Sequence, residues 1–194
     1  SWSGLGRNSI CHCENCERKF RAHAGQPIPR TRDWNSPAYR TWIQWNYARR
    51  LEIWDQNNRI TRAAGGPDCV WVGMNGGQLS GQAEKFRDFK AICERAEIIM
   101  LDDQRRDNDS GFQRNGQVGK LVHGLLGWDK VMPESMAMYQ TSSPTFRLTS
   151  KPAPEARLWM LEGFAGGIQP WWHHVGAYQE DRRQFHTAEP VLRW

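Results

Sequence analysis

The feature that most constrains this fold is the alternation of strand-like apolar runs with helical segments. The clearest example is the stretch Leu158 to Arg183, where a helix stops at Gly166-Gly167 and a short apolar run then ends in aromatic and imidazole side chains. Similar strand-like runs occupy residues 69–74, 97–101 and 130–139. Strands that are apolar throughout, rather than at every second position, are typical of parallel sheets covered by helices.

Four such strand–helix units predict an α/β fold, namely the C-terminal half of a (β/α)8 barrel whose first strands lie upstream of Ser1. Four units alone would leave open sheet edges, and a closed barrel of this kind takes roughly 250 residues, whereas this chain has 194. We therefore interpret residues 1–194 as a fragment of one catalytic domain, with a Cys-rich loop over residues 1–35 inside it. The alternative is a small open doubly wound sheet, but no Gly-rich phosphate loop follows a strand.

Local signals place the helices. Ser36-Pro37 combines an N-cap with a proline at the first helical position, which predicts a helix from Pro37 to about Gln56. Its apolar face should carry Trp42, Trp45, Ala48 and Leu51. Further helices are expected over residues 17–24 and 82–95, before Gly127, and from about Pro154 into the stretch that starts at Leu158.

The composition excludes some partners. The net charge is +5, but the 26 Lys and Arg residues are scattered among 21 Asp and Glu residues without forming a basic stripe, so we expect no nucleic-acid partner. No apolar run is long enough to span a bilayer, so we expect no membrane partner. The cellular compartment and a homo-oligomeric state stay open.

Polar residues end each strand-like run or, in the run over residues 130–139, interrupt it together with Pro133. They are Asn75, Asp102 and Asp103, Glu134, and His173 and His174. Each one alone is as readily explained by a helix cap or a loop hydrogen bond. Because the carboxyl ends of barrel strands meet on one face, four such ends in succession predict a site there.

Within that site we expect the carboxylates to be catalytic. Glu134 is a candidate nucleophile or acid/base for cleavage of a glycosidic bond, which two carboxylates flank. Asp102 or Asp103 would be the second carboxylate or would orient a sugar hydroxyl. Two adjacent like charges raise the pKa of one of them, as a general acid requires. An ordinary loop carboxylate is the alternative for Glu134.

The remaining candidates would bind the substrate. Trp171 and Trp172 offer stacking faces for a sugar ring, and His173 and His174 offer hydrogen bonds or proton transfer near neutral pH. Arg105 would bind an acidic sugar, with a solvated surface position as its alternative. Asn75 and Tyr139, which lie at the ends of their runs, complete this set.

Cys11, Cys13 and Cys16 form a C-x-C-x-x-C cluster. Three thiols at this spacing can surround a structural zinc ion, with a fourth ligand from His12, His23, Cys69 or an upstream residue. Free thiols and a disulfide pair are the alternatives, although five cysteines cannot all pair within the chain. We expect no organic cofactor.

Several segments resemble one family. CHCENCERKF, followed by DWNSP and a Trp-rich helix, resembles part of a group of (β/α)8 glycoside hydrolases. This group is catalogued as hypothetical glycosyl hydrolases, and it is related to alpha-L-fucosidase-like and family 42 beta-galactosidase-like barrels. MLDDQ, PESMAMYQ and EGFAGGIQPWWHHVGAYQEDRR are similar to the same group.

The resemblance implies a retaining glycoside hydrolase with a carbohydrate substrate. It implies that Cys11, Cys13 and Cys16 hold zinc with a fourth ligand outside this chain. It also implies that Glu134 is the nucleophile if its strand is the seventh, and that the acid/base residue lies upstream of Ser1. The alternatives are a carbohydrate-binding barrel without catalysis and a zinc-dependent interaction module.

Overall fold

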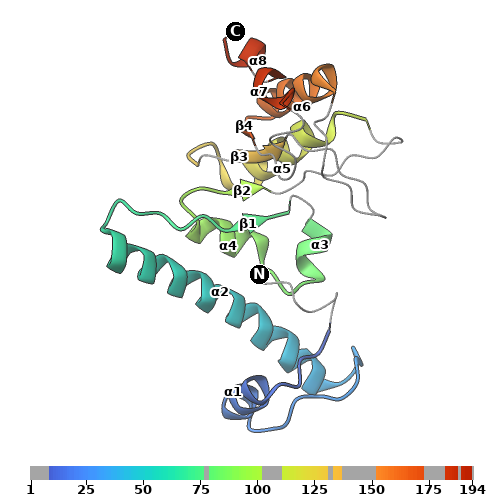
Figure 1. Cartoon of the computed structure of the whole chain (residues 1–194). Helices are drawn as coiled ribbons and strands as arrows, with labels where there is room; N and C mark the ends of the chain where they lie inside the picture. The colour runs from blue at the N-terminus through green and yellow to red at the C-terminus, as the bar shows by residue number, and fades with distance from the viewer. Residues whose placement is uncertain are drawn as a thin grey trace. The chain divides into compact units, whose positions relative to one another are not determined.

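A computed structural model describes residues 9–76, 79–101, 111–130, 133–136, 152–172, 182–187 and 189–193. In these residues the chain is a helix-rich α/β protein with one small parallel sheet (Figure 1). It divides into two compact units, which we call the helical unit (Ser1–Trp71 and Gln78–Arg95) and the sheet unit (Val72–Gly77 and Ala96–Trp194). None of the described helices combines the length and the apolar character needed to cross a membrane.

The helical unit contains α1 (Glu14–Ala24), α2 (Pro37–Gly65), α3 (Leu79–Ala83) and α4 (Phe89–Arg95). The predicted start of α2 is confirmed, because Ser36 is its N-cap and the Ser36 hydroxyl accepts a hydrogen bond from the Tyr39 amide at 3.4 Å. The predicted end at Gln56 is wrong. The helix continues to Gly65, and α4 holds this polar extension through Asn58, whose side chain donates to the Arg95 carbonyl at 3.0 Å.

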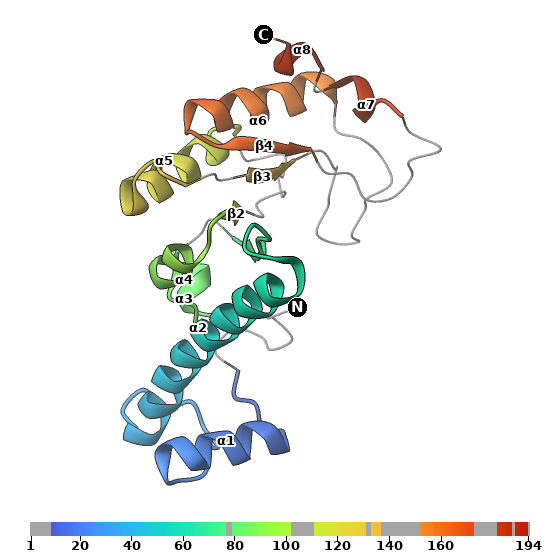
Figure 2. The ribbon, with the colours of Figure 1, turned by 90° about the vertical axis from the view of Figure 1, so that its left-hand side faces the viewer.

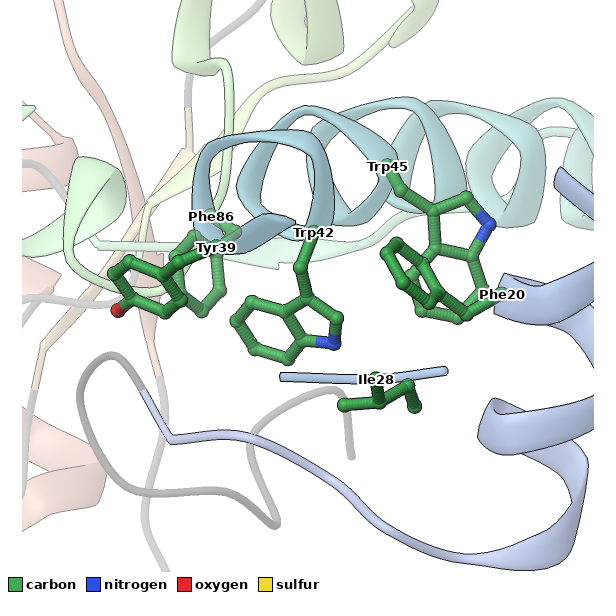
Figure 3. Packing of buried hydrophobic residues seen from close by; sticks show 6 residues of the cluster. All are labelled: Phe20, Ile28, Tyr39, Trp42, Trp45 and Phe86. Atoms are coloured by element: carbon green, nitrogen blue, oxygen red, sulfur yellow. The ribbon is translucent and has the colours of Figure 1, made fainter. Parts of the chain in front are cut away.

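Aromatic residues form the core of the helical unit (Figure 3). This cluster consists of Phe20, Ile28, Tyr39, Trp42, Trp45 and Phe86. The predicted burial of Trp42 and Trp45 is confirmed, whereas Ala48 is exposed. The reason is geometric: each step of three residues falls about 60° short of a full helical turn, so the face has rotated away from the core by Ala48.

The single helix predicted over residues 82–95 is broken into α3 and α4. Phe86 lies in the break with a positive φ of 55°, a conformation that costs a non-glycine residue about 1–3 kcal/mol. Its ring packs edge-on against Trp42 at 5.0 Å, which offsets that cost. Phe89, Ile92 and Cys93 are buried as the helical pattern predicts.

The sheet unit is built on four parallel strands. They are β1 (Met74–Asn75), β2 (Met100–Leu101), β3 (Pro133–Met136) and β4 (Gln169–Trp172), and they lie side by side in the order β1-β2-β3-β4. The strands are shorter than predicted. Pro133 and Glu134 begin β3 instead of interrupting it, because a proline without an amide hydrogen is tolerated at the first position of a strand.

The sheet unit contains two long helices. They are α5 (Arg114–Leu126) and α6 (Ala153–Ala165), which pack against each other, and α6 also contacts β3 and β4 (Figure 2). The short helices α7 (Gln184–Thr187) and α8 (Glu189–Leu192) contact α6. The units β2-α5-β3 and β3-α6-β4 therefore follow one another along the sheet.

Candidate functional site

Three thiols come together at the start of α1. Cys11 precedes the helix, Cys13 is its N-cap residue and Cys16 lies in its first turn, and their sulfur atoms all lie within 4.8 Å of one another. The helix begins at Glu14, three residues before the predicted start at Glu17, so the turn of α1 itself brings Cys16 next to Cys13. The predicted cluster is therefore one group in space.

The surroundings of the thiols shift their pKa values in opposite directions. The backbone amide of Cys16, followed by the thiols of Cys16 and Cys11, lowers the pKa of the Cys13 thiol. Burial, followed by the neighbouring thiols, raises the pKa of Cys16 to about 12. Cys13 is exposed and Cys16 is half-buried, so the cluster has one side open to solvent.

The donor set fits a thiophilic metal ion. Zinc–sulfur bonds of about 2.3 Å in a tetrahedral site separate the sulfur atoms by about 3.8 Å, which is within the 4.8 Å limit found here. All five cysteines are free in this structure. No fourth Cys, His, Asp or Glu among the described residues joins the group.

Three residues are candidates for the fourth ligand from the sequence, and each of them lies outside the group of three thiols, among other contacts. The Nδ1 atom of His12 lies 2.9 Å from a Glu17 carboxylate oxygen. The Cys69 thiol donates to the Gly65 carbonyl at 2.9 Å. His23 lines a groove between α1 and α2. The described residues could therefore supply three ligands to a metal ion, and a fourth would come from another donor.

Glu134 lies in one row of residues across the sheet. Asn75 pairs with Leu101, Leu101 with Glu134, and Glu134 with Pro170. Strands in a sheet are about 4.8 Å apart, so this row places Glu134 beside the strand that leads into Asp102 and Asp103. In the next two rows, Trp171 pairs with Ser135 and Trp172 with Met136.

The exact places of these residues differ from the predictions. Glu134 is the second residue of β3, and Trp171 and Trp172 are the last two residues of β4, so all three lie inside their strands and not after them. Asn75 is 2% exposed, and its side-chain amide donates to the Gly73 carbonyl at 3.4 Å. Trp171 is half-buried.

Six predicted site residues lie outside the described residues. They are Asp102, Asp103, Arg105, Tyr139, His173 and His174. For Glu134 and Trp172 the backbone alone is described.

One set of residues that the structure brings together was not predicted from the sequence. A groove between α1 and α2 is lined by basic side chains of both helices. A sequence signal did exist, because Lys19 and His23 on one helix and Trp45 and Arg49 on the other are each four residues apart, which is the spacing of neighbours on one helical face. The sequence spacing did not indicate that these two helical faces would pack against each other.

No family model, no curated protein and no solved structure matches this chain. Its function is therefore argued from its own residues.

Proposed function

We propose that the chain is the C-terminal part of a (β/α)8 catalytic domain of a retaining glycoside hydrolase, with Glu134 as a catalytic carboxylate. The observation that carries this proposal is the row Asn75–Leu101–Glu134–Pro170 across a parallel sheet. The segments that resemble hypothetical glycosyl hydrolases supply the reaction class.

The strand order supports the barrel over a doubly wound sheet. A doubly wound sheet reverses its strand order at a switch point, whereas the four described strands follow the chain order. The helices α5 and α6 contact each other, as neighbouring helices do on the outside of a barrel. Closure with further strands would cover the open edges at β1 and β4.

The proposed reaction assigns a role to each carboxylate. In retaining glycosidases the two carboxyl groups are about 5–5.5 Å apart, one acting as nucleophile and the other as acid/base. We assign Glu134 as the nucleophile, and its partner to the upstream strands. Asp102 or Asp103 would orient sugar hydroxyls or supply the second carboxylate. The sugar-binding wall would comprise Asn75, Arg105, Tyr139, Trp171, Trp172, His173 and His174.

The test uses the gene product together with its upstream sequence. Glu134→Gln should lower kcat/KM for aryl-glycosides by a factor of about 10²–10⁴, since it removes the reacting carboxylate and keeps its shape. Glu94→Gln is the matched control, because Glu94 is an exposed residue of α4. Unchanged turnover in Glu134→Gln would remove Glu134 from the mechanism. Sugar binding without cleavage would favour the carbohydrate-binding alternative.

We further propose that zinc is the ion for Cys11, Cys13 and Cys16, with a fourth ligand from elsewhere. Thiolates select soft ions, and four-coordinate zinc with cysteine ligands is the usual structural site. Zinc bound there would fix the segment before α1 to the first turn of that helix. A zinc-dependent interaction module would need the same ion, so the metal alone does not separate it from the hydrolase.

A further inference from the structure

A groove of about 360 Å³ lies between α1 and α2, inside the helical unit. Helix α1 contributes Arg18, Lys19, Ala22 and His23, and α2 contributes Trp45, Arg49 and Glu52. Trp45 is 6% exposed and turns toward Phe20 of α1, so it belongs to the rigid interface of the two helices (Figure 3). The groove is thus a fixed concave surface and not a gap between loops.

The charges around the groove are unbalanced. Arg18, Lys19 and Arg49 are cationic, whereas Glu52 is the single acid in the lining and forms an ion pair with Arg49. Arg18 donates to a neutral acceptor, the side-chain oxygen of Asn15, at 3.0 Å. Two positive charges therefore remain without a carboxylate partner among the described residues, before His23 is counted.

The rest of the helical unit adds to the positive electrostatic potential around the groove. The helical unit holds fifteen Lys and Arg residues against nine Asp and Glu residues, whereas the sheet unit holds eleven against twelve. The positive charge of the chain is thus concentrated in the unit that carries the groove. Such a field raises the local concentration of anions.

We propose that this groove binds a phosphate monoester on a sugar-sized molecule. A phosphate monoester carries about −1.5 to −2 charges at pH 7, which matches the two uncompensated cations. Guanidinium groups bind phosphate oxygens through paired hydrogen bonds, and the Trp45 indole adds an apolar surface. The volume falls in the range of about 300–1,000 Å³ that is usual for small-molecule sites. This site is independent of glycoside hydrolysis.

The test is calorimetric titration of the chain with glucose 6-phosphate at low salt. Saturable binding with a Kd on the order of 1 mM is expected for an open site of this charge. Arg18→Ala and Lys19→Ala should each weaken it about fivefold to tenfold, and Glu52→Gln should tighten it about threefold. Since Arg18, Lys19 and Glu52 are exposed, these changes leave the core intact.

Two matched controls separate the effect of charges in the groove from the effect of the overall charge on binding. Arg59→Ala and Lys90→Ala each remove one exposed positive charge from the same unit outside the groove, and binding should stay unchanged. An equal loss in these controls, or no saturable binding by the unaltered chain, overturns the proposal.

Other ligands test the chemistry. Glucose should not bind, and glucose 6-sulfate, a monoanion, should bind more weakly than the phosphate ester. Inorganic phosphate should also bind more weakly, because it lacks the sugar, which would contact the rest of the groove lining. Equal binding of glucose or of the sulfate ester would refute recognition of a phosphate dianion, and equal binding of inorganic phosphate would refute recognition of the sugar.

Discussion

The side chain of His123 connects two distant turns of the sheet unit. Its Nδ1 atom lies 2.9 Å from the Gly127 carbonyl oxygen, and its Nε2 atom lies 3.0 Å from that of Gly167. The ring stacks on Trp128 with centroids 3.6 Å apart. Both ring nitrogens thus lie within hydrogen-bond distance of a backbone carbonyl oxygen, and the tautomer decides which of them donates. The end of α5 is thereby joined to the turn that starts β4.

Replacing His123 with Phe should therefore destabilise the sheet unit. The change keeps a ring beside Trp128 but removes both ring nitrogens, and with them the hydrogen bond that the imidazole N–H donates to a backbone carbonyl. The free energy of unfolding, measured in urea, should fall by about 1–3 kcal/mol. His186→Phe changes an exposed histidine and is the control. An unchanged midpoint in His123→Phe would show that these contacts add nothing to stability.

The thiol cluster makes a second prediction for single residues. Protein prepared under reducing conditions should contain about one zinc ion per chain, since three thiolates and one further ligand complete a tetrahedral site. Cys13→Ser and Cys16→Ser should lose most of it, as measured by elemental analysis. Cys69→Ser should retain the zinc ion, because the Cys69 thiol donates a hydrogen bond to the Gly65 carbonyl instead. Zinc-free unaltered protein would contradict the site.

Among the helices, α5 and α6 approach each other at glycine residues. A Cβ atom on Gly116 would lie 2.6 Å from the Glu162 carbonyl oxygen, and one on Gly119 would lie 2.3 Å from the Gly166 carbonyl oxygen. These atoms belong to the backbone and cannot rotate away. The two helices are therefore in contact along their main chains.

Gly119→Ala should push these helices apart and lower the free energy of unfolding by about 1–3 kcal/mol. The control lies in the same helix: a Cβ atom on Gly124 meets nothing within 4 Å. Gly124→Ala should raise stability by about 0.5–1 kcal/mol, because alanine loses less backbone entropy in a helix. In urea unfolding, the two variants should change the free energy of unfolding in opposite directions. Equal changes in both variants would refute the close approach of the helices at Gly119.

Elements with local signals could be predicted from the sequence, and elements set by distant contacts could not. Ser36-Pro37 fixes the start of α2, and Gly127 follows the end of α5, as expected. The extension of α2 to Gly65 depends on contacts with α4, and the break at Phe86 depends on packing against Trp42. The cysteine cluster was predictable because its spacing is short. The groove was not, because it needs two helices to meet.

For the molecule as a whole, the barrel proposal predicts a difference between this chain and a longer product. The chain extended by its upstream sequence should cleave aryl-glycosides, and it should unfold in urea with a steeper dependence on denaturant, because more surface becomes buried. The chain alone should not cleave them. Activity of the chain alone would place both catalytic carboxylates within residues 1–194.

The order of the strands also has a consequence for biosynthesis. Each strand from β2 onward pairs with the strand that precedes it in the chain. A ribosome releases the N-terminal partner of every pair first, so the sheet can grow by one strand at a time during translation. Among the four described strands, none has to wait for a partner made much later, which shortens the exposure of unpaired edges to other nascent chains.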